Sequence, residues 1–164
     1  MPSAALVRHP DTPSVALRAI DARVVRDGNE LRVAYVLQGE IDRLRLAPPR
    51  AAGALWQHTC CELFVTQALP AYREYNFAPS GEWAAYAFSS YRQGGPLETR
   101  DPRIVVTRGT GRLELSATIS AQPGRLRLGL SVVVEEENIS FWALKHAPGK
   151  PDFHHPDAFA LELE

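Results

Sequence analysis

The stretch Leu31-Arg-Val-Ala-Tyr-Val-Leu37 decides the fold class, because large apolar residues stand at every second position. Successive side chains of a β-strand point to opposite faces, so one face of this strand carries Leu31, Val33, Tyr35 and Leu37. Residues 27–29 read Asp-Gly-Asn and favour a turn, because glycine and asparagine tolerate positive φ. The run 15–25 before that turn also alternates. Together the two segments predict a β-hairpin.

The same alternation recurs along most of the chain and predicts about ten strands. Beyond the first hairpin, the expected strands cover residues 41–46, 59–65, both arms of a hairpin within 72–92, 103–107, 112–119, 126–134, 139–145 and 159–163. Proline and glycine separate many of these runs, and residues 48–53 predict a surface loop.

Helical signals are weak throughout the chain. The best helical candidate, residues 70–75, is short, and 13 prolines disfavour long helices. Many short strands joined by glycine and proline turns predict an all-β fold, an antiparallel β-sandwich of jelly-roll type. No linker or internal repeat divides residues 1–164, so we expect a single domain.

Composition excludes several classes of function. The chain has 18 basic and 19 acidic residues, a formal net charge of −1, so it lacks the basic excess that binds nucleic acid. No apolar run approaches the roughly 18 residues of a membrane span, and no signal peptide is apparent at the N-terminus. We therefore expect a soluble cytoplasmic protein with neither a nucleic-acid nor a membrane partner. Nothing in the pattern indicates its oligomeric state.

The adjacent cysteines Cys60 and Cys61 are predicted to stay free, because neighbours in a strand point to opposite faces. In the same strand Glu62 shares a face with Cys60 and Phe64. An ionised carboxylate between apolar neighbours is costly unless it has hydrogen-bond donors. Glu62 is therefore either a strand-edge residue in contact with water, or a carboxylate that accepts hydrogen bonds from ligand hydroxyls or an arginine.

The aromatic hairpin within residues 72–92 is a second candidate region. Trp83 shares a face with Ala85 and Ala87, while Tyr86 and Phe88 lie on the other face with Ala84. Small alanines beside large rings leave room that either core packing or a ligand fills. Asn76 and Arg92 are stronger candidates for ligand contact than any one ring, because they add directional donors.

A polar loop pinned by prolines follows the strand at 139–145. It carries Lys145, His146, Lys150, Asp152 and His154, and rigid loops at sheet ends often hold binding groups. Three other interpretations stay open. A metal site would recruit His146, Asp152, His154 and Asp157. A catalytic histidine oriented by an aspartate is the second, and a purely structural loop is the third. No serine or cysteine stands in a nucleophile motif, so a hydrolytic triad is unsupported.

These segments resemble the DOMON-like superfamily, which includes the family 9 carbohydrate-binding modules and some haem-binding domains. The resemblance rests on Trp56 with Glu62 six residues later, the hairpin that turns at Gly81, and the late strand with Trp142. Residues 142–157 are similar to those of small bacterial DOMON-like proteins. The resemblance implies a β-sandwich in which two tryptophans, Trp56 and Trp142, sandwich a sugar. It also implies that Glu62 and, more loosely, Asn76 bind the sugar's hydroxyls.

Departures from the family limit what else the resemblance implies. Thr59, Cys60 and Cys61 stand where acidic residues are frequent, which weakens the expectation of a calcium contact. Met1 is the only methionine, so haem ligation by methionine is excluded, although ligation by histidine or lysine stays open.

The sequence therefore predicts a non-catalytic module for a saccharide or a related small ligand, with no required cofactor. An enzyme that uses the loop 145–157 and a haem-binding domain are the alternatives. The predicted ligand-binding residues are Trp56, Glu62, Asn76, Trp83, Arg92, Trp142, Lys145, His146, Lys150, Asp152 and His154.

Overall fold

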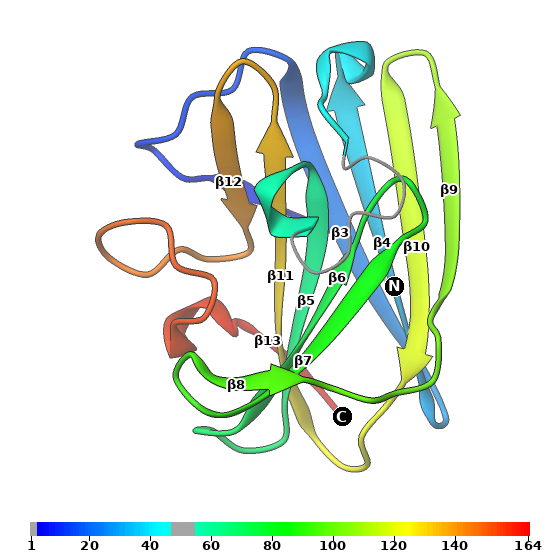
Figure 1. Ribbon diagram of the computed structural model, residues 1–164, viewed down its shortest axis with the longest axis vertical. Coiled ribbons are helices and arrows are strands. Elements are labelled where there is room, and N and C mark those ends of the chain that lie inside the picture. Colours follow the sequence, from blue (N-terminus) through cyan, green and yellow to red (C-terminus); the bar gives the residue numbers. More distant parts are fainter. Residues whose placement is uncertain (1–2, 47–54) are drawn as a thin grey trace.

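Two antiparallel sheets face each other in the computed structural model, which describes residues 3–46 and 55–164 (Figure 1). The small sheet has the order β1-β3-β4-β10-β9, with bounds Ala4–Ala5, Leu17–Asp27, Glu30–Gly39, Arg112–Ser120 and Arg103–Gly109. The large sheet has the order β2-β12-β11-β5-β6-β7-β8, with bounds Val7–Arg8, Ile139–Ala143, Leu126–Glu135, Cys60–Thr66, Tyr72–Phe77, Trp83–Ser90 and Gln93–Pro96. A further strand, β13 (Leu161–Leu163), pairs with β11. The predicted all-β antiparallel sandwich is confirmed, and the loop predicted at residues 48–53 lies outside the described residues.

The hairpin predicted from the opening stretch is β3 and β4. The two strands pair down to Asp27 and Glu30, and Gly28 in the turn has φ of 57°. Leu31, Val33, Tyr35 and Leu37 are fully buried against the large sheet. The turn and the alternation thus define the register and the buried face as expected.

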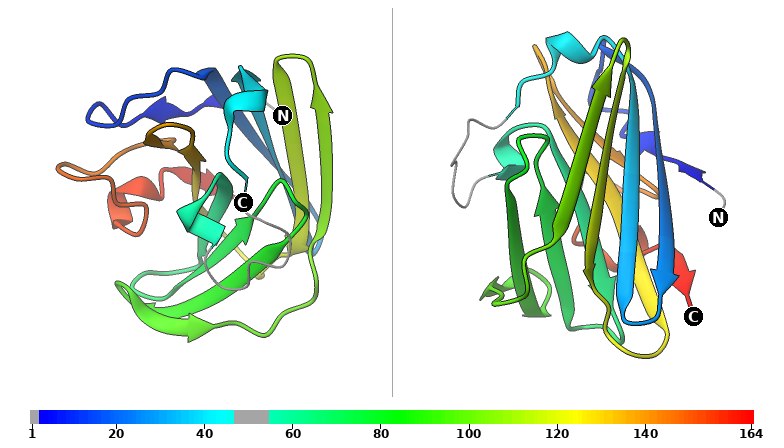
Figure 2. Two further views of the ribbon diagram at one scale, coloured as in Figure 1. Left: turned by 45° about the horizontal axis from the view of Figure 1, so that its top comes forward. Right: turned by 90° about the vertical axis from the view of Figure 1, so that its right-hand side faces the viewer.

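The main core fills the space between the sheets, which Figure 2 shows facing each other (right). On β5 its members are Cys61, Leu63 and Val65, the inward-facing alternate residues. Tyr35 spans this core, and its hydroxyl donates a hydrogen bond of 2.5 Å to the main-chain oxygen of Glu62. The strand that carries Glu62 is therefore tied to the opposite sheet.

A second apolar cluster lies on the other side of the large sheet, its outer face. The cluster joins strand residues to the 144–159 segment, and its buried members are Phe64, Tyr72, Val133, Ala143, Phe153, Ala158 and Phe159. Gly129 of β11 permits the contact, because a Cβ there would lie 3.2 Å from the main-chain oxygen of Ala158 and 3.3 Å from the ring of Phe159. The large sheet is therefore covered on both faces.

Two local predictions are wrong. Residues 41–46 do not form a strand, because Ile41–Arg43 is a 3₁₀ helix that buries Ile41, and Leu44 three residues later is buried as well. A three-residue repeat of apolar positions fits a 3₁₀ turn. Residues 70–75 are not helical, since Tyr72–Phe77 is a strand paired on both sides.

The expectation for the two cysteines holds. Cys60 and Cys61 are both free and buried. The short strands β1, β2 and β8 escaped prediction because so few residues carry no readable period. No helix among the described residues is long and apolar enough to cross a membrane.

Candidate functional site

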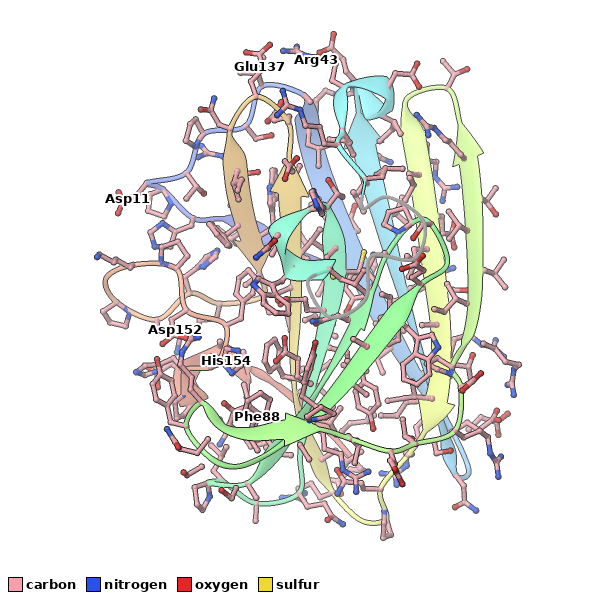
Figure 3. All side chains as sticks on the ribbon, in the orientation of Figure 1. Asp11, Arg43, Phe88, Glu137, Asp152 and His154 are labelled. Atoms are coloured by element: carbon pink, nitrogen blue, oxygen red, sulfur yellow. The ribbon has the colours of Figure 1, made fainter. Side chains whose placement is uncertain are left out.

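A cavity of about 350 Å³ lies between the outer face of the large sheet and the 144–159 segment. Figure 3 shows Asp152 and His154 of that segment close to Phe88 of β7. We call this cavity the outer-face pocket, and its lining residues are Trp56, Glu62, Glu74, Tyr86, Phe88, Arg92, Val133, Phe141, Pro151, Phe153 and His154.

Two acidic residues, Glu62 of β5 and Glu74 of β6, form part of the lining. Glu62 pairs with Asn76 across the two strands, so Glu74 is its diagonal neighbour on the same face. Both residues are buried, with 3% of Glu62 and 6% of Glu74 exposed. Glu62 accepts a 3.4 Å hydrogen bond from the Ser131 hydroxyl. Two buried carboxyl groups therefore line the same pocket.

Burial sets the charge state of these acids. It raises the pKa of Glu62 well above the usual range, and the nearby Glu74 carboxylate raises it further. Burial also raises the pKa of Glu74 to about 7, while the Asn76 amide and the Arg92 guanidinium act in the opposite direction. Near neutral pH the empty pocket therefore holds at least one protonated carboxyl group.

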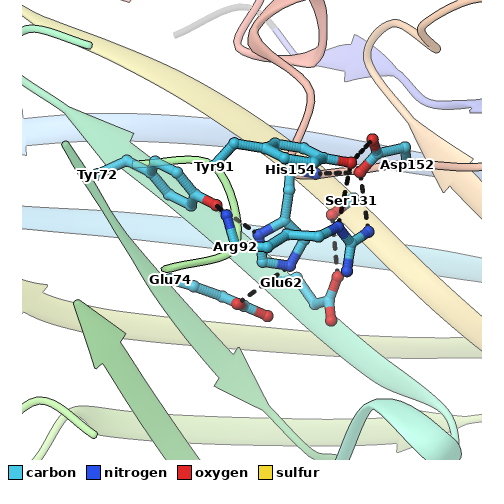
Figure 4. Close-up of polar contacts among 8 residues, drawn as sticks. All are labelled: Glu62, Tyr72, Glu74, Tyr91, Arg92, Ser131, Asp152 and His154. Carbon is cyan, nitrogen blue, oxygen red and sulfur yellow. Dashed lines mark hydrogen bonds and ion pairs between the residues drawn. The ribbon is translucent and has the colours of Figure 1, made fainter. Parts of the chain in front are cut away.

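His154 connects the 144–159 segment to these strands, as Figure 4 shows. The main-chain N–H of Arg92 donates to the Tyr72 hydroxyl (3.0 Å), whose oxygen lies 2.8 Å from His154 Nδ1. Burial, followed by the Arg92 charge, lowers the pKa of His154 to about 4, so its ring is neutral at pH 7. With the Tyr72 hydroxyl donating to Nδ1, the ring proton is on Nε2, which lies 3.5 Å from Glu74 Oε2.

Arg92 stands in the tight turn between β7 and β8 in the left-handed region, with φ of 55°. That conformation costs a non-glycine residue of order 1–3 kcal/mol and persists where neighbouring contacts hold it. Here the guanidinium lies 2.9 Å from Asp152 Oδ1 and 3.1 Å from the Tyr91 hydroxyl. The Tyr91 hydroxyl also donates to Asp152, which in turn accepts the His154 main-chain N–H (3.1 Å). Arg92 and Asp152 thus fasten the loop to the hairpin beside the pocket.

Trp56 lies on the short 3₁₀ helix Leu55–Gln57 and contributes a mostly solvent-facing ring. Its residue is 44% exposed, and its indole meets the Tyr86 ring edge-to-face at 6.5 Å. Phe88, Phe141 and Phe153 add apolar surface deeper in the lining. The pocket therefore combines aromatic walls with buried carboxyl groups.

Asn76 is on the outer face but is sealed beneath other residues. It is fully buried, does not line the pocket, and neither polar atom of its amide has a hydrogen-bond partner among the described residues. It lies beside Glu74 and influences that carboxyl group without meeting hydrogen-bond geometry.

The structure does not bring Trp83 or Trp142 to the pocket. Trp142 pairs with Val132 on the inward side of the large sheet, is 6% exposed, and donates its indole N–H to the Ser140 hydroxyl (3.0 Å). Trp83 packs against the same inter-sheet core. Phe141, one residue before Trp142, points outward instead and lines the pocket.

The remaining candidates in the loop are also outside the pocket lining. Lys145 and Lys150 are exposed. His146 lies 2.6 Å from the main-chain oxygen of Val7 through Nε2, and burial lowers its pKa. Asp157 lies near His155 instead of the other proposed metal ligands. In the described ranges, no three His, Cys, Asp or Glu side chains are grouped to hold a metal ion.

Sequence reasoning missed several pocket residues. It overlooked Glu74, Phe141 and Phe153, and it noticed Tyr86 and Phe88 only as possible packing residues. A signal for Glu74 exists, because it stands two residues before Asn76 and so shares its face once 72–77 is taken as a strand.

Comparison with solved structures identifies the fold as that of the family 9 carbohydrate-binding modules, which confirms the resemblance at the level of fold. One such module from Caldicellulosiruptor kristjanssonii, in complex with cellotriose, is 8% identical, with a TM-score of 0.61 over 89% of this chain and 75% of that one. The module in complex with glucose is 10% identical, with a TM-score of 0.57 over 80% and 69%.

A further similar structure is a proposed carbohydrate-binding protein from Bacteroides uniformis. It is 14% identical to this chain, with a TM-score of 0.72 over 96% of this chain and 83% of that one. No protein-family profile and no curated protein sequence matches the chain.

Proposed function

We propose that the protein is a non-catalytic carbohydrate-binding module whose outer-face pocket holds a saccharide. The observation that carries the proposal is one cavity, of about 350 Å³, in which an exposed indole, further aromatic rings, two buried carboxyl groups and an arginine converge. Pockets for small ligands have volumes of about 300–1,000 Å³ and combine apolar walls with a few placed polar groups.

The lining matches the two kinds of surface that a sugar presents. The C–H faces of a pyranose ring are apolar and pack on an aromatic plane, for which the half-exposed Trp56 is available. Hydroxyl groups need donors and acceptors, and charged partners give the stronger hydrogen bonds. Glu62 supplies acceptors and Arg92 supplies donors in the same cavity. The resemblance implied that Trp56 and Trp142 both stack on the sugar. In this proposal Trp56 stacks on it alone.

The similar structures support the proposal independently. Two of them are family 9 modules in complex with cellotriose and glucose, and their fold extends over most of this chain. Because these identities are low, the support concerns the scaffold, and the lining described above supplies the argument about the ligand.

Isothermal titration calorimetry tests the proposal with glucose, cellotriose and a panel of neutral mono- and oligosaccharides. We expect at least one to bind, and Trp56→Ala to weaken that binding by about tenfold or more, equivalent to about 1.4 kcal/mol. Trp83→Phe is the matched control, because Trp83 packs in the core, and it should bind like the wild type. If no saccharide binds, or if Trp56→Ala binds as tightly as the wild type, the proposal is wrong.

A further inference from the structure

The acidic and basic groups around the outer-face pocket do not balance. Glu62 and Glu74 approach from β5 and β6, and among the residues that the structure describes Arg92 is the one arginine in the lining. Arg92 is already paired with Asp152 at 2.9 Å, while His154 is neutral at pH 7 because its pKa is lowered to about 4. With both glutamates ionised, the pocket would carry two negative charges without a cationic partner.

Few protein groups are available to stabilise these carboxylates. Glu62 accepts one long hydrogen bond of 3.4 Å from Ser131. The nearest cation or ring nitrogen to Glu74 is His154 Nε2 at 3.5 Å. Among the residues that the structure describes, neither carboxylate has an ammonium or guanidinium group in salt-bridge contact. Buried carboxylates without such partners cost several kcal/mol, so the sheet gains no stability from them.

The inward face of the same strands shows what packing alone requires. There Leu63 and Tyr75 pair across β5 and β6, in the positions between Glu62 and Glu74, and they are fully or almost fully buried. Apolar residues on the outer face would pack as well and avoid the cost of buried acids. The two carboxyl groups are therefore better explained by a ligand than by the fold.

The walls favour a positively charged ligand as well. Trp56, Tyr86, Phe88, Phe141 and Phe153 surround the cavity. The faces of aromatic rings attract cations, by about 2 kcal/mol or more where water is excluded. An ammonium group in this cavity would thus meet carboxylates and ring faces in the same place.

We infer that the outer-face pocket selects a saccharide bearing a protonated amine, an amino sugar, whose ammonium group lies against Glu62 and Glu74. This inference rests on the proposed function and names the class of its ligand. The amine brings the missing positive charge, and the pyranose ring remains available to Trp56. A neutral sugar would fill the same space but would leave the acids without a cation.

Binding should release protons. Without ligand at least one glutamate is protonated near neutral pH, because burial raises the pKa of Glu74 to about 7, and burial and the charge of Glu74 raise the pKa of Glu62 well above its usual range. When an ammonium group enters, a carboxylic acid loses its proton to solvent and the resulting carboxylate pairs with the ammonium. Tyr86, Arg92 and His154 also line this space, Asp152 pairs with Arg92 beside it, and each of the four keeps its charge in the exchange.

The experiment compares glucosamine, glucose and N-acetylglucosamine by calorimetry at pH 6.5, in phosphate and in an amine buffer. These sugars differ only at C2, and the amine of glucosamine is protonated at this pH. We expect glucosamine to bind at least about tenfold more tightly than glucose. Its apparent enthalpy should also differ between the buffers, as proton release requires, whereas that of glucose should not.

Variants locate the ammonium group. Glu74→Gln should bring the ratio of glucosamine to glucose affinity close to one, and Glu62→Gln should lower it. Asp42→Asn removes an equal charge from an exposed carboxylate paired with Arg108, and it should leave the ratio unchanged. Thermal unfolding of each variant verifies folding, and both Gln variants should be at least as stable as the wild type.

The outcomes separate this inference from the proposed function. If no sugar in either panel binds, the proposed function is wrong and the inference falls with it. If glucose or N-acetylglucosamine binds as tightly as glucosamine, the pocket binds saccharides but the inference is wrong. A preference for glucosamine that survives Glu74→Gln and Glu62→Gln in folded protein would also overturn it, because the ammonium would then lie elsewhere.

Discussion

The two faces of the large sheet come from alternate residues of the same strands, yet their chemistry is opposite. The inward residues of β5 are Cys61, Leu63 and Val65, all packed against the small sheet. On the outward side of this strand Glu62 stands between Cys60 and Phe64, and it faces a cavity. Both faces are buried, so burial does not distinguish them. The outer face differs because its buried groups include acids, an imidazole and unfilled space, which core packing does not require.

The largest difference between the faces should appear in a pair of tryptophan variants. Trp142→Ala removes a large side chain from the core and should lower the free energy of unfolding by about 3–5 kcal/mol. Trp56→Ala removes a ring that is 44% exposed at the pocket, and it should change stability by about 0.5 kcal/mol or less. Urea unfolding measures both. Equal losses would mean that Trp56 is as structural as Trp142.

The acids make the outer face sensitive to pH. A carboxyl group whose pKa is raised by folding stabilises the fold below its unfolded pKa, and that stability is lost as pH rises through the folded pKa. Folding raises the pKa of Glu74 from 4.5 to about 7, so the free energy of unfolding falls by about 3 kcal/mol between these two pH values. Glu62 adds a loss of the same sign. The pKa of His154 is lowered from 6.5 to about 4, so its contribution to the stability of the fold is lost as pH falls. This effect has the opposite sign and offsets that of one glutamate.

The wild-type protein should therefore unfold more easily at pH 8 than at pH 5, because the effect of two carboxyl groups with raised pKa exceeds that of one imidazole with lowered pKa. In the double variant Glu62→Gln/Glu74→Gln only His154 remains of these three, so stability should rise between pH 4 and 6.5 and then level off. Denaturant titrations at several pH values give both profiles. A wild-type protein that is more stable at pH 8 than at pH 5 would contradict the assignment.

A smaller effect is expected from Tyr72, which links the strands to the loop through a single hydroxyl. Tyr72→Phe keeps the stacking on Phe88 at 4.7 Å but removes the contact to His154 Nδ1 and the acceptor for the Arg92 N–H. Loss of this hydroxyl should lower the free energy of unfolding by about 1 kcal/mol. Nitrogen NMR of the imidazole should show the Nε2–H tautomer in the wild type and a mixture in the variant. An unchanged tautomer would show that Tyr72 does not set it.

The smallest change in stability is expected for Asp152→Asn, since its partner Arg92 has a side chain that is 51% exposed. Exposed ion pairs contribute about 0–1 kcal/mol. The effect should be local, because Asp152 fastens the loop to the hairpin. Hydrogen exchange should become faster at residues 151–155 and stay unchanged in β5. Faster exchange throughout β5 would show that the loop supports the whole sheet.

In the long strands that it identified, such as β4 and β5, alternation in the sequence separated the two residue sets correctly but could not say which set faces the core. For 59–65, Glu62 was assigned to one face with Cys60 and Phe64, as observed. In 139–145, by contrast, Trp142 and Phe141 are both large and aromatic, and only the pairing with β11 shows that Phe141 faces the pocket. The first hairpin succeeded because its turn and its apolar face agree.

The pocket itself depends on contacts that no local pattern encodes. His154 meets Glu74 and Tyr72 across about 80 residues of chain, as the separation of 82 for its contact with Tyr72 shows. Glu74 was missed although residues 72–77 were expected within a strand, because only the pairing of that strand with β5 places Glu74 beside Glu62. The resemblance to family 9 modules added Trp56 to the candidate residues, whereas alternation alone had already singled out Glu62.

The position of Pro151, Phe153 and His154 late in the chain has a consequence for biosynthesis. N-terminal parts of a protein leave the ribosome first and begin to fold before later residues are made. Strands β5, β6 and β7, which carry Glu62, Glu74 and Phe88, are synthesised well before the loop that walls the pocket. During that interval the aromatic and acidic surface beneath it is open to water. Under the proposed function, a sugar would stabilise the finished protein and not its nascent precursors, since a ligand stabilises only the state that binds it.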